Sequence, residues 1–350
     1  MFLDGLFVFV LGFILANFLK WGFTHLPGER WQMLAVVPRQ KNGQNLWQGT
    51  NLTYYGFFLA TSQLLAIILF IALLAAMYGS IYGGLLIALI ILSCCIPAAR
   101  IIAILVEKKR HTFTIGGASF LGILLAPWVI MGVESLLADQ GSFLPTIPVL
   151  AAMSIAYTLG EGLGRLGCIS FGCCYGKPLK ACHPWLQQLF AKRNFIFHGA
   201  TKKVAYEGGL TGERLIPIQA ITCMVYTCGA LIGAFLFLFG CFTEALLLTI
   251  VLTQLWRIFS ETLRADFRGF GKISAYQKMG MVSVLYMLAV TAFLPASDYI
   301  DPEIINGIDK LWNPAIILAL QLFWLVSFLI FGRSTVTTAS VSFDLVRKHI

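Results

Sequence analysis

The sequence predicts an all-α fold, a polytopic integral membrane bundle of about nine helices. Of its 350 residues, 58% are hydrophobic and only 12% are charged, whereas a soluble domain carries about a quarter charged residues. The mean hydropathy is +0.82, and apolar runs of about 20 residues, the length that crosses a bilayer, recur along the chain. We therefore expect most side chains to face lipid or one another rather than water.

The apolar runs define the predicted spans in order. The first is expected to be a retained helix rather than a signal peptide, because it contains Asp4, lacks a basic start and is not followed by a cleavage site of small residues. Glycines interrupt the end of the fifth run, and the eighth run is short. The nine predicted spans are residues 2–24, 54–77, 81–106, 114–138, 147–170, 215–239, 242–263, 277–295 and 313–332.

The longest hydrophilic connection, residues 171–214, separates the fifth and sixth spans. The stretch HPWLQQLFAKR, residues 183–193, is compatible with a short helix. The stretch FIFHGATKKVAYEGG, residues 195–209, is compatible with short strands. We expect a polar insert here and no separate soluble domain.

The net charge of +9 is interpreted as a signal of topology rather than of nucleic-acid binding, because basic loops orient membrane proteins. With nine spans the connections alternate between two faces, and nearly all the basic loop residues fall on one of them. This basic face comprises residues 25–53, 107–113, 171–214, 264–276 and the C-terminal tail, whereas the opposite face has Lys310. The positive-inside rule predicts that the basic face is cytoplasmic and that the N-terminus lies outside.

Charged residues within or beside membrane spans are costly and are therefore candidate functional residues. Arg165 lies in the glycine-rich stretch GEGLGRLGCISFGCCYGKP, residues 160–178. Arg100 ends the stretch CCIPAAR in the third span. Arginines at span ends also extend to lipid head groups without further function, and this alternative stays open for Arg100.

A second group of charges lies in WRIFSETLRADFRG. Arg257, Glu261 and Arg264 follow i, i+4, i+7 spacing, which predicts a single helical face on which Glu261 pairs with either arginine. Gly116 and Gly117, at the start of the fourth span, would let a head group approach the backbone. Arginines that converge on glycine-rich turns at a membrane surface predict a phosphate site, because guanidinium binds phosphate bidentately. The alternative is a purely structural ion pair.

Cysteines cluster around the glycine-rich stretch, at positions 168, 173, 174 and 182. Their spacing matches no zinc pattern, and a disulfide framework is not expected in a long membrane protein. Cys173 and Cys174 are candidate reactive thiols, with the filling of a tight turn as the alternative.

These stretches resemble, in order, the signatures of prolipoprotein diacylglyceryl transferases. RLGCISFGCCYGKP resembles the family's G-R-x-G-N-F-x-N-x-E-x-x-G, and LTYYGFFLA resembles its W-Y-G. AARIIAI followed by TIGGASFLG resembles G-x-R-x-x-Y followed by G-G-x-S-F-H-G, and WRIFSETLRADFRG resembles F-R-F-x-x-E-x-x-R-x-P-D. Ser274 and Gln277 stand near the family's S-x-x-Q. The resemblance covers about residues 50–295.

The resemblance implies a seven-helix transferase core with one extra helix at each end. The extra N-terminal helix and a basic loop would occupy residues 1–50. The core would occupy residues 51–295, including the polar insert 171–214. The extra C-terminal helix and tail would occupy residues 296–350.

The resemblance also implies an activity. A diacylglyceryl group would pass from phosphatidylglycerol to the thiol of a prolipoprotein cysteine, forming a thioether and releasing glycerol phosphate. The resemblance implies no metal or organic cofactor, no nucleic-acid partner and a location in the bacterial cytoplasmic (inner) membrane. Carried over by position, the catalytic residues are Arg165, Arg257, Glu261 and Arg264, and the lipid-binding residues are Tyr55, Arg100, Gly116, Gly117, Ser119 and Cys168.

The chain departs from the family pattern on the acceptor side. Leu121 replaces the histidine of S-F-H-G, and Cys168 replaces the first asparagine of the signature. The family's P-S-Q-L-Y-E stretch corresponds to IPIQAIT, with Pro217 and Gln219. Loop histidines are alternative bases, namely His111, His183 and His198.

Three interpretations therefore stay open. The acceptor is a prolipoprotein cysteine, or it is another nucleophile, or the protein binds or transports phospholipid without catalysis. The family resemblance places the arginine face outside the cytoplasm, whereas loop charge places it inside, where the acceptor would be a cytoplasmic molecule or an inner-leaflet lipid.

Overall fold

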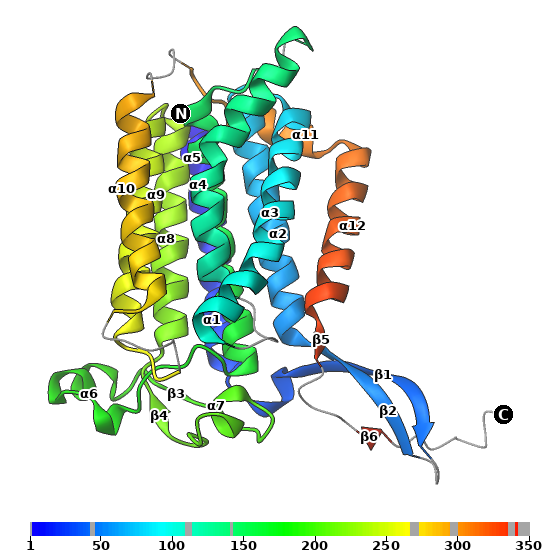
Figure 1. Ribbon diagram of the computed structural model, residues 1–350, viewed down its shortest axis with the longest axis vertical. Helices are drawn as coiled ribbons and strands as arrows, with labels where there is room; N and C mark the ends of the chain where they lie inside the picture. Colours follow the sequence, from blue (N-terminus) through cyan, green and yellow to red (C-terminus); the bar gives the residue numbers. More distant parts are fainter. Residues whose placement is uncertain are drawn as a thin grey trace.

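The computed structural model describes residues 2–42, 46–108, 114–140, 143–266, 273–294, 300–334 and 340–341. Long helices run alternately up and down through this part of the chain and form a single bundle (Figure 1). They are α1 (Phe2–His25), α2 (Tyr54–Ala76), α3 (Ile81–Glu107), α4 (Ile115–Leu137), α5 (Thr146–Phe171), α8 (Ile218–Leu238), α9 (Phe242–Glu261), α10 (Ala275–Phe293) and α12 (Pro314–Phe331). The predicted all-α membrane bundle is confirmed, and each predicted span coincides with one of these helices.

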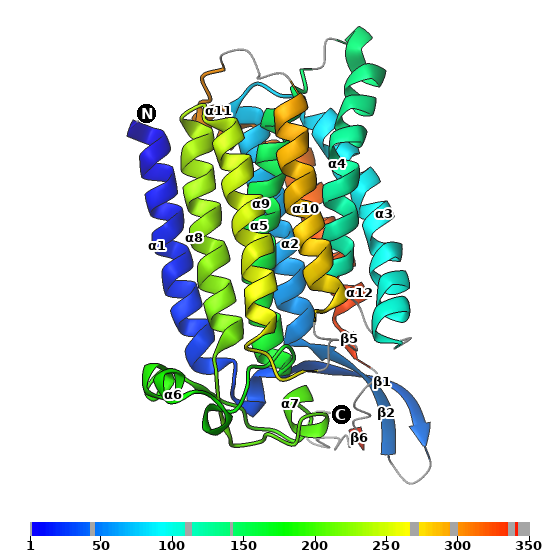
Figure 2. The same cartoon turned by 60° about the vertical axis from the view of Figure 1, so that its left-hand side comes forward.

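Eight of the long helices are apolar enough to cross a bilayer by length and composition. The other one is α10, which carries Lys278 in its first turn. It packs against α9 and α4 and lies parallel to the neighbouring helices in both views (Figure 2). The bundle thus keeps the alternation of direction on which the predicted loop faces depend.

The centre of the bundle is α5, which is buried along nearly its whole length and packs against α2, α8 and α9. Its glycines permit this close packing. A Cβ atom on Gly162 would lie 3.0 Å from the Cβ of Tyr226, and one on Gly167 would lie 3.0 Å from the carbonyl oxygen of Tyr55. The glycine-rich stretch therefore packs helices together, as small residues commonly do in membranes.

The polar connections gather at one end of the bundle, which is the lower end in Figure 1. The insert contains η3 (Leu179–Ala181), α6 (Pro184–Phe190), β3 (Phe195–Ile196), α7 (Lys203–Tyr206) and β4 (Arg214–Leu215). The predicted helix is confirmed by α6, and the predicted strand by β3. The strand prediction is wrong at residues 203–206, which form a helical turn that packs against the end of α5.

Further elements were not predicted. They are η1 (Glu29–Trp31), the hairpin strands β1 (Met33–Asn42) and β2 (Leu46–Thr53), η2 (Ala138–Gln140), α11 (Ile304–Leu311), β5 (Arg333–Ser334) and β6 (Ser340–Val341). Both β5 and β6 pair with β2 in antiparallel register. The backbone N–H of Thr53 donates to the carbonyl of Gly332 at 2.9 Å, and a Cβ atom on Gly56 would lie 2.1 Å from the Cα of Gly332. The end of α12 is thereby fixed against the start of α2.

A buried lysine joins the insert to two helix ends. The Nζ atom of Lys202, which is fully buried, donates to the carbonyl of Ser170 at 2.6 Å and to that of Leu26 at 3.1 Å. The second carbonyl follows α1, and the first belongs to the last turn of α5. Such carbonyls lack helical partners and favour a positive charge.

Burial lowers the pKa of Lys202 from 10.5 to about 8. Between these values the unfolded chain binds more protons than the folded one, so stability rises with pH across this window and falls as the pH returns to 8. We expect the thermal stability of the wild type relative to Lys202→Met to increase from pH 8 to pH 10.5, by up to about 1.4 kcal/mol per pH unit. Thermal unfolding in detergent measures this difference.

The control is Lys203→Met, which removes a neighbouring lysine that pairs with Glu207 at 3.1 Å. Burial lowers the pKa of Lys203, but its hydrogen bond with Glu207 and nearby negative groups outweigh burial and raise the pKa above its ordinary value. The difference between wild type and Lys203→Met should therefore not show the same rise. A constant or shrinking difference between wild type and Lys202→Met would contradict the assignment.

Candidate functional site

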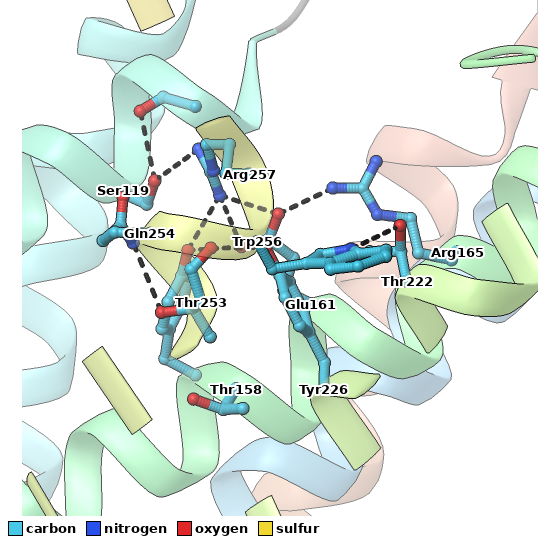
Figure 3. Close-up of polar contacts among 12 residues, drawn as sticks. Ser119, Thr158, Glu161, Arg165, Thr222, Tyr226, Thr253, Gln254, Trp256 and Arg257 are labelled. Atoms are coloured by element: carbon cyan, nitrogen blue, oxygen red, sulfur yellow. Dashed lines mark hydrogen bonds and ion pairs between the residues drawn. The ribbon is translucent and has the colours of Figure 1, made fainter. Parts of the chain in front are cut away.

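The site is built around the carboxylate of Glu161 on α5 (Figure 3). The Nη2 atom of Arg257 donates to both carboxylate oxygens, at 2.7 and 2.6 Å. The Nη2 atom of Arg165 donates to Oε1 at 2.7 Å from the opposite side. The hydroxyl of Tyr157 donates to Oε2 and accepts a hydrogen bond from Arg257 at 2.8 Å. One acidic group thus joins two arginines from different helices.

Local helical geometry explains this arrangement. Tyr157, Glu161 and Arg165 are spaced four residues apart on α5 and therefore lie on one face. Arg257 lies in the last turns of α9, which packs against that face. The side chains of Glu161, Arg257 and Arg165 are 2%, 9% and 13% exposed, so the charges interact in a largely desolvated space.

A third helix contributes to the Arg257 environment. The Nη1 atom of Arg257 donates to the Oγ of Ser119 on α4 at 3.0 Å. A Cβ atom on Gly116 would lie 2.9 Å from the same nitrogen, so glycine leaves room for the guanidinium. A Cβ atom on Gly117 would instead lie 2.6 Å from Ile102 on α3. Gly116 and Ser119 therefore belong to the site, while Gly117 packs α4 against α3.

The predicted pairing of Glu261 with Arg257 or Arg264 is wrong. The helix α9 ends at Glu261, so Arg264 lies in the following turn and not on the expected helical face. Arg264 forms a bidentate pair with Asp266, with both distances 2.7 Å. The carboxylate of Glu261 accepts a hydrogen bond from Ser274. Ser274 forms a capping box at the start of α10 with Gln277.

The turn that holds Arg264 lies against the glycine-rich loop. The N–H of Lys177 donates to the carbonyl of Leu263 at 3.0 Å, and the N–H of Ala265 donates to that of Tyr175 at 3.1 Å. Arg264 lies within Coulombic range of both Cys174 and Arg165. The structure therefore brings three of the predicted arginines to one end of the bundle.

The remaining predicted lipid-binding residues divide into two groups. The rings of Tyr55 and Phe171 lie with their centroids 5.7 Å apart. Tyr55 also lies within Coulombic range of Arg165 and of Cys168. Arg100 lies on α3 with an exposed side chain. Within the described residues, the contacts of the Glu161 carboxylate come from α5 and α9 rather than from Arg100.

The alternative bases lie elsewhere. His183 accepts from the N–H of Trp185 at 3.4 Å and begins α6 with an exposed ring. His198 is also exposed, on the polar insert. His111 lies outside the described residues. Leu121 lies on α4 and is half-buried.

Sequence reasoning assigned no role to Glu161 or Tyr157. The signal was present, because Glu161 is an acidic residue inside a predicted span and stands four residues before Arg165. Asp266 was also missed, since a carboxylate two residues beyond Arg264 can pair with it only when the chain leaves the helix.

The charges of the site do not balance. Two guanidinium groups share a single carboxylate, and the Nε donors of Arg165 and Arg257 are buried without a hydrogen-bond partner. An uncompensated buried charge and unpaired donors are both costly. An anion bound beside these arginines would compensate for both.

Residues 45–294 match the family model of prolipoprotein diacylglyceryl transferase. The chain belongs to this family. The matched region extends from β2 to the end of α10. It includes the Glu161 cluster, which consists of Ser119, Tyr157, Glu161, Arg165 and Arg257. A search of curated proteins finds no match to the chain. Together with the apolar helices, membership of the prolipoprotein diacylglyceryl transferase family identifies a multi-pass membrane protein of a transferase family.

Ser119 supports Arg257 without carrying charge, so its loss should have a modest effect. We expect Ser119→Ala to lower the transfer rate of a family-type assay by at least about tenfold, because one hydrogen bond to a charged group is worth about 1.5–3 kcal/mol. The matched control is Ser135→Ala on the same helix, whose hydroxyl donates to the carbonyl of Met131 away from the cluster. Equal rates for the two variants would contradict the contribution of Ser119.

Proposed function

We propose that the protein transfers a diacylglyceryl group from phosphatidylglycerol to a thiol acceptor, a prolipoprotein cysteine being the acceptor that the family name indicates. The acceptor sulfur attacks the carbon of the diacylglyceryl group that is bonded to the phosphate ester oxygen. The carbon–oxygen bond breaks, a thioether forms, and glycerol phosphate leaves with the bonding electrons. The thiol proton is released to the surrounding water. We propose the bacterial cytoplasmic membrane as the location.

One observation carries this proposal. The site has two buried arginines for one carboxylate, with an unpartnered Nε donor on each arginine. A phospholipid phosphate supplies the missing negative charge and accepts from guanidinium donors with suitable geometry. The surrounding helices are apolar, as acyl chains require.

Each of these residues has a separate role in the proposed reaction. Arg165 and Arg257 hold the phosphate, and Glu161 fixes the orientation of both guanidinium groups. Arg264, held by Asp266, stabilises the charge that develops on the departing glycerol phosphate. Ser119 and Tyr55 border the head-group space.

The test uses the purified protein in nanodiscs with phosphatidylglycerol labelled in its terminal glycerol. A peptide with a lipobox cysteine is added as acceptor, and both released glycerol phosphate and lipidated peptide are measured. We expect both products from the wild type and from Arg193→Ala, which removes an exposed arginine of the insert. We expect neither product from Arg165→Ala. Binding of the labelled lipid without release would favour lipid binding or transport instead.

The orientation in the membrane decides between exported and cytoplasmic acceptors. Alkaline phosphatase fused after Thr201 reports on the polar insert, and the same enzyme fused after Asp139 reports on the opposite end. Activity at Thr201 alone supports a site that faces exported prolipoproteins. Activity at Asp139 alone supports the orientation that loop charge predicts, with a cytoplasmic acceptor.

A further inference from the structure

Three cysteine sulfurs meet at the polar end of α5. The Sγ atoms of Cys168, Cys173 and Cys174 all lie within 4.8 Å of one another. Cys168 is buried, whereas Cys173 and Cys174 are half-buried. We call these three residues the thiol trio. The trio lies near the Glu161 cluster, as shown by the Coulombic interactions of Arg165 with Cys168 and Cys174.

The end of α5 explains why the sulfurs meet. Gly172 has φ +71° and accepts the left-handed conformation that ends the helix. The N–H of Cys173 donates to the carbonyl of Cys168 at 3.0 Å, and that of Gly172 donates to Ile169 at 3.2 Å. These two bonds form a Schellman motif, in which the side chains at the positions of Cys168 and Cys173 approach each other.

The turn is held in place from two further directions. The N–H of Val204 donates to the carbonyl of Gly172 at 2.9 Å. The side-chain amide of Gln219 donates to the carbonyl of Cys173 at 3.0 Å. Cys174 itself has φ 56°, a conformation that a non-glycine residue adopts at a cost of about 1–2 kcal/mol. The surrounding contacts therefore hold the turn that brings the three sulfurs together.

This arrangement suits a thiophilic metal ion. Zinc binds thiolates at about 2.3 Å, which places tetrahedral sulfur ligands about 3.8 Å apart. The sulfurs need to move by no more than about 1 Å to reach that spacing. Three protein ligands leave a fourth position open, which is the arrangement of catalytic rather than structural zinc sites. Zinc with three thiolates carries a net charge of −1, and the positive charges of Arg165 and Arg264 interact with these cysteines.

We propose that the thiol trio binds a zinc ion whose open position activates the acceptor thiol for diacylglyceryl transfer. This inference rests on the proposed function. Zinc binding displaces one proton from each of the three cysteines. The acceptor thiol then replaces the zinc-bound water and loses its proton to solvent, because a metal-bound thiol is deprotonated.

The transfer step needs no oxidant or reductant. The zinc-bound thiolate attacks the glyceryl carbon, the carbon–oxygen bond breaks, and its electrons stay with the departing glycerol phosphate. The product thioether is neutral and a weaker ligand, so it dissociates and water returns to the zinc. The metal fills a chemical gap, because Glu161 is paired with two arginines and the side chain of Leu121 has no basic atom.

Metal binding is tested first without any activity assay. The full chain is purified in detergent with a phosphine reductant, its zinc content is measured, and Co²⁺ is titrated into the metal-free protein. We expect a single equivalent of metal and the visible absorption of tetrahedral, thiolate-bound cobalt. We expect Cys168→Ser/Cys173→Ser/Cys174→Ser to lose both signals. The matched control, Cys94→Ser/Cys182→Ser/Cys228→Ser, removes three cysteines outside the trio and should keep both.

Alkylation of the wild type provides a second measurement that needs no variant. Bound metal should protect the three cysteines of the trio from a thiol reagent, and a chelator should remove this protection, as peptide mass spectrometry would show. A folded wild type that binds no Co²⁺, or that shows equal alkylation of the trio with and without metal, would overturn the inference.

The two proposals fail in distinguishable ways. Transfer that continues at the wild-type rate in protein shown to be metal-free would remove the zinc inference and leave the transferase standing. Metal binding by the trio without transfer to any thiol acceptor would remove the activating role and count against the proposed function. Two results together support both proposals. The trio variant shows no transfer, and added zinc restores glycerol phosphate release to metal-free wild type but not to the trio variant.

Discussion

Arg257→Lys is expected to lower the rate of diacylglyceryl transfer by about 10²–10³-fold, as loss of a preorganised donor to developing charge does in other enzymes. Arg257 reaches Ser119 through Nη1 and Glu161 and Tyr157 through Nη2. A lysine keeps the charge but presents one ammonium group, which cannot hold these partners and a phosphate together. The rate of glycerol phosphate release from labelled phosphatidylglycerol measures the effect.

The matched control is Arg193→Lys, the same exchange at an exposed position of the insert. It should retain the wild-type rate, and both variants should remain monodisperse in detergent. A folded Arg257→Lys protein with the wild-type rate would contradict the role of the guanidinium, since charge alone would then be sufficient.

Glu161→Gln is expected to have the largest effect on stability. The carboxylate is 2% exposed and is shared by Arg165 and Arg257. The amide leaves two buried cations without a counter-charge, and breaking a buried pair in this way costs about 3–5 kcal/mol. Thermal unfolding in detergent should show a strongly lowered midpoint for this variant.

Glu244→Gln serves as the control, because Glu244 is exposed in the first turn of α9. We further expect an anionic lipid to restore part of the stability of Glu161→Gln, since its phosphate would supply the lost negative charge. Unchanged stability of Glu161→Gln would show that the arginines do not depend on this carboxylate.

The fold was predictable to a large extent because the membrane restricts the choices. Apolar runs of sufficient length must form helices, and their boundaries agree closely with α1 to α5, α8 to α10 and α12. The hairpin of β1 and β2 was not predictable in the same way. Its strands depend on pairing with each other and with β5, which comes from the far end of the chain.

The candidate site was predicted in its arginines but not in its carboxylate. The i, i+4, i+7 spacing predicts a helix through Arg264, whereas α9 ends at Glu261. For this reason the spacing predicts the wrong partner for Glu261. The correct partner of Arg257 is Glu161, which is far from it in sequence and meets it only because α5 and α9 pack together. Contacts of this kind follow from tertiary packing and not from local spacing.

The cysteine turn shows the same limit at shorter range. The spacing of Cys168, Cys173 and Cys174 does not resemble a metal-binding pattern, yet their sulfurs meet. The cause is the reversal of chain direction at Gly172, which a search for fixed ligand spacing does not detect. A glycine that ends a helix between two cysteines is therefore a useful signal to add.

The junction of Gly332 with Thr53 and Gly56 has a practical consequence for protein engineering. The first helix of the family-matched region, α2, begins on backbone supplied by the opposite terminus. A shortened version that stops after α10 would remove Gly332 and leave Thr53 and Gly56 without this backbone neighbour. Any attempt to isolate a minimal catalytic unit should consequently retain α12, or join its last turn to β2 by design.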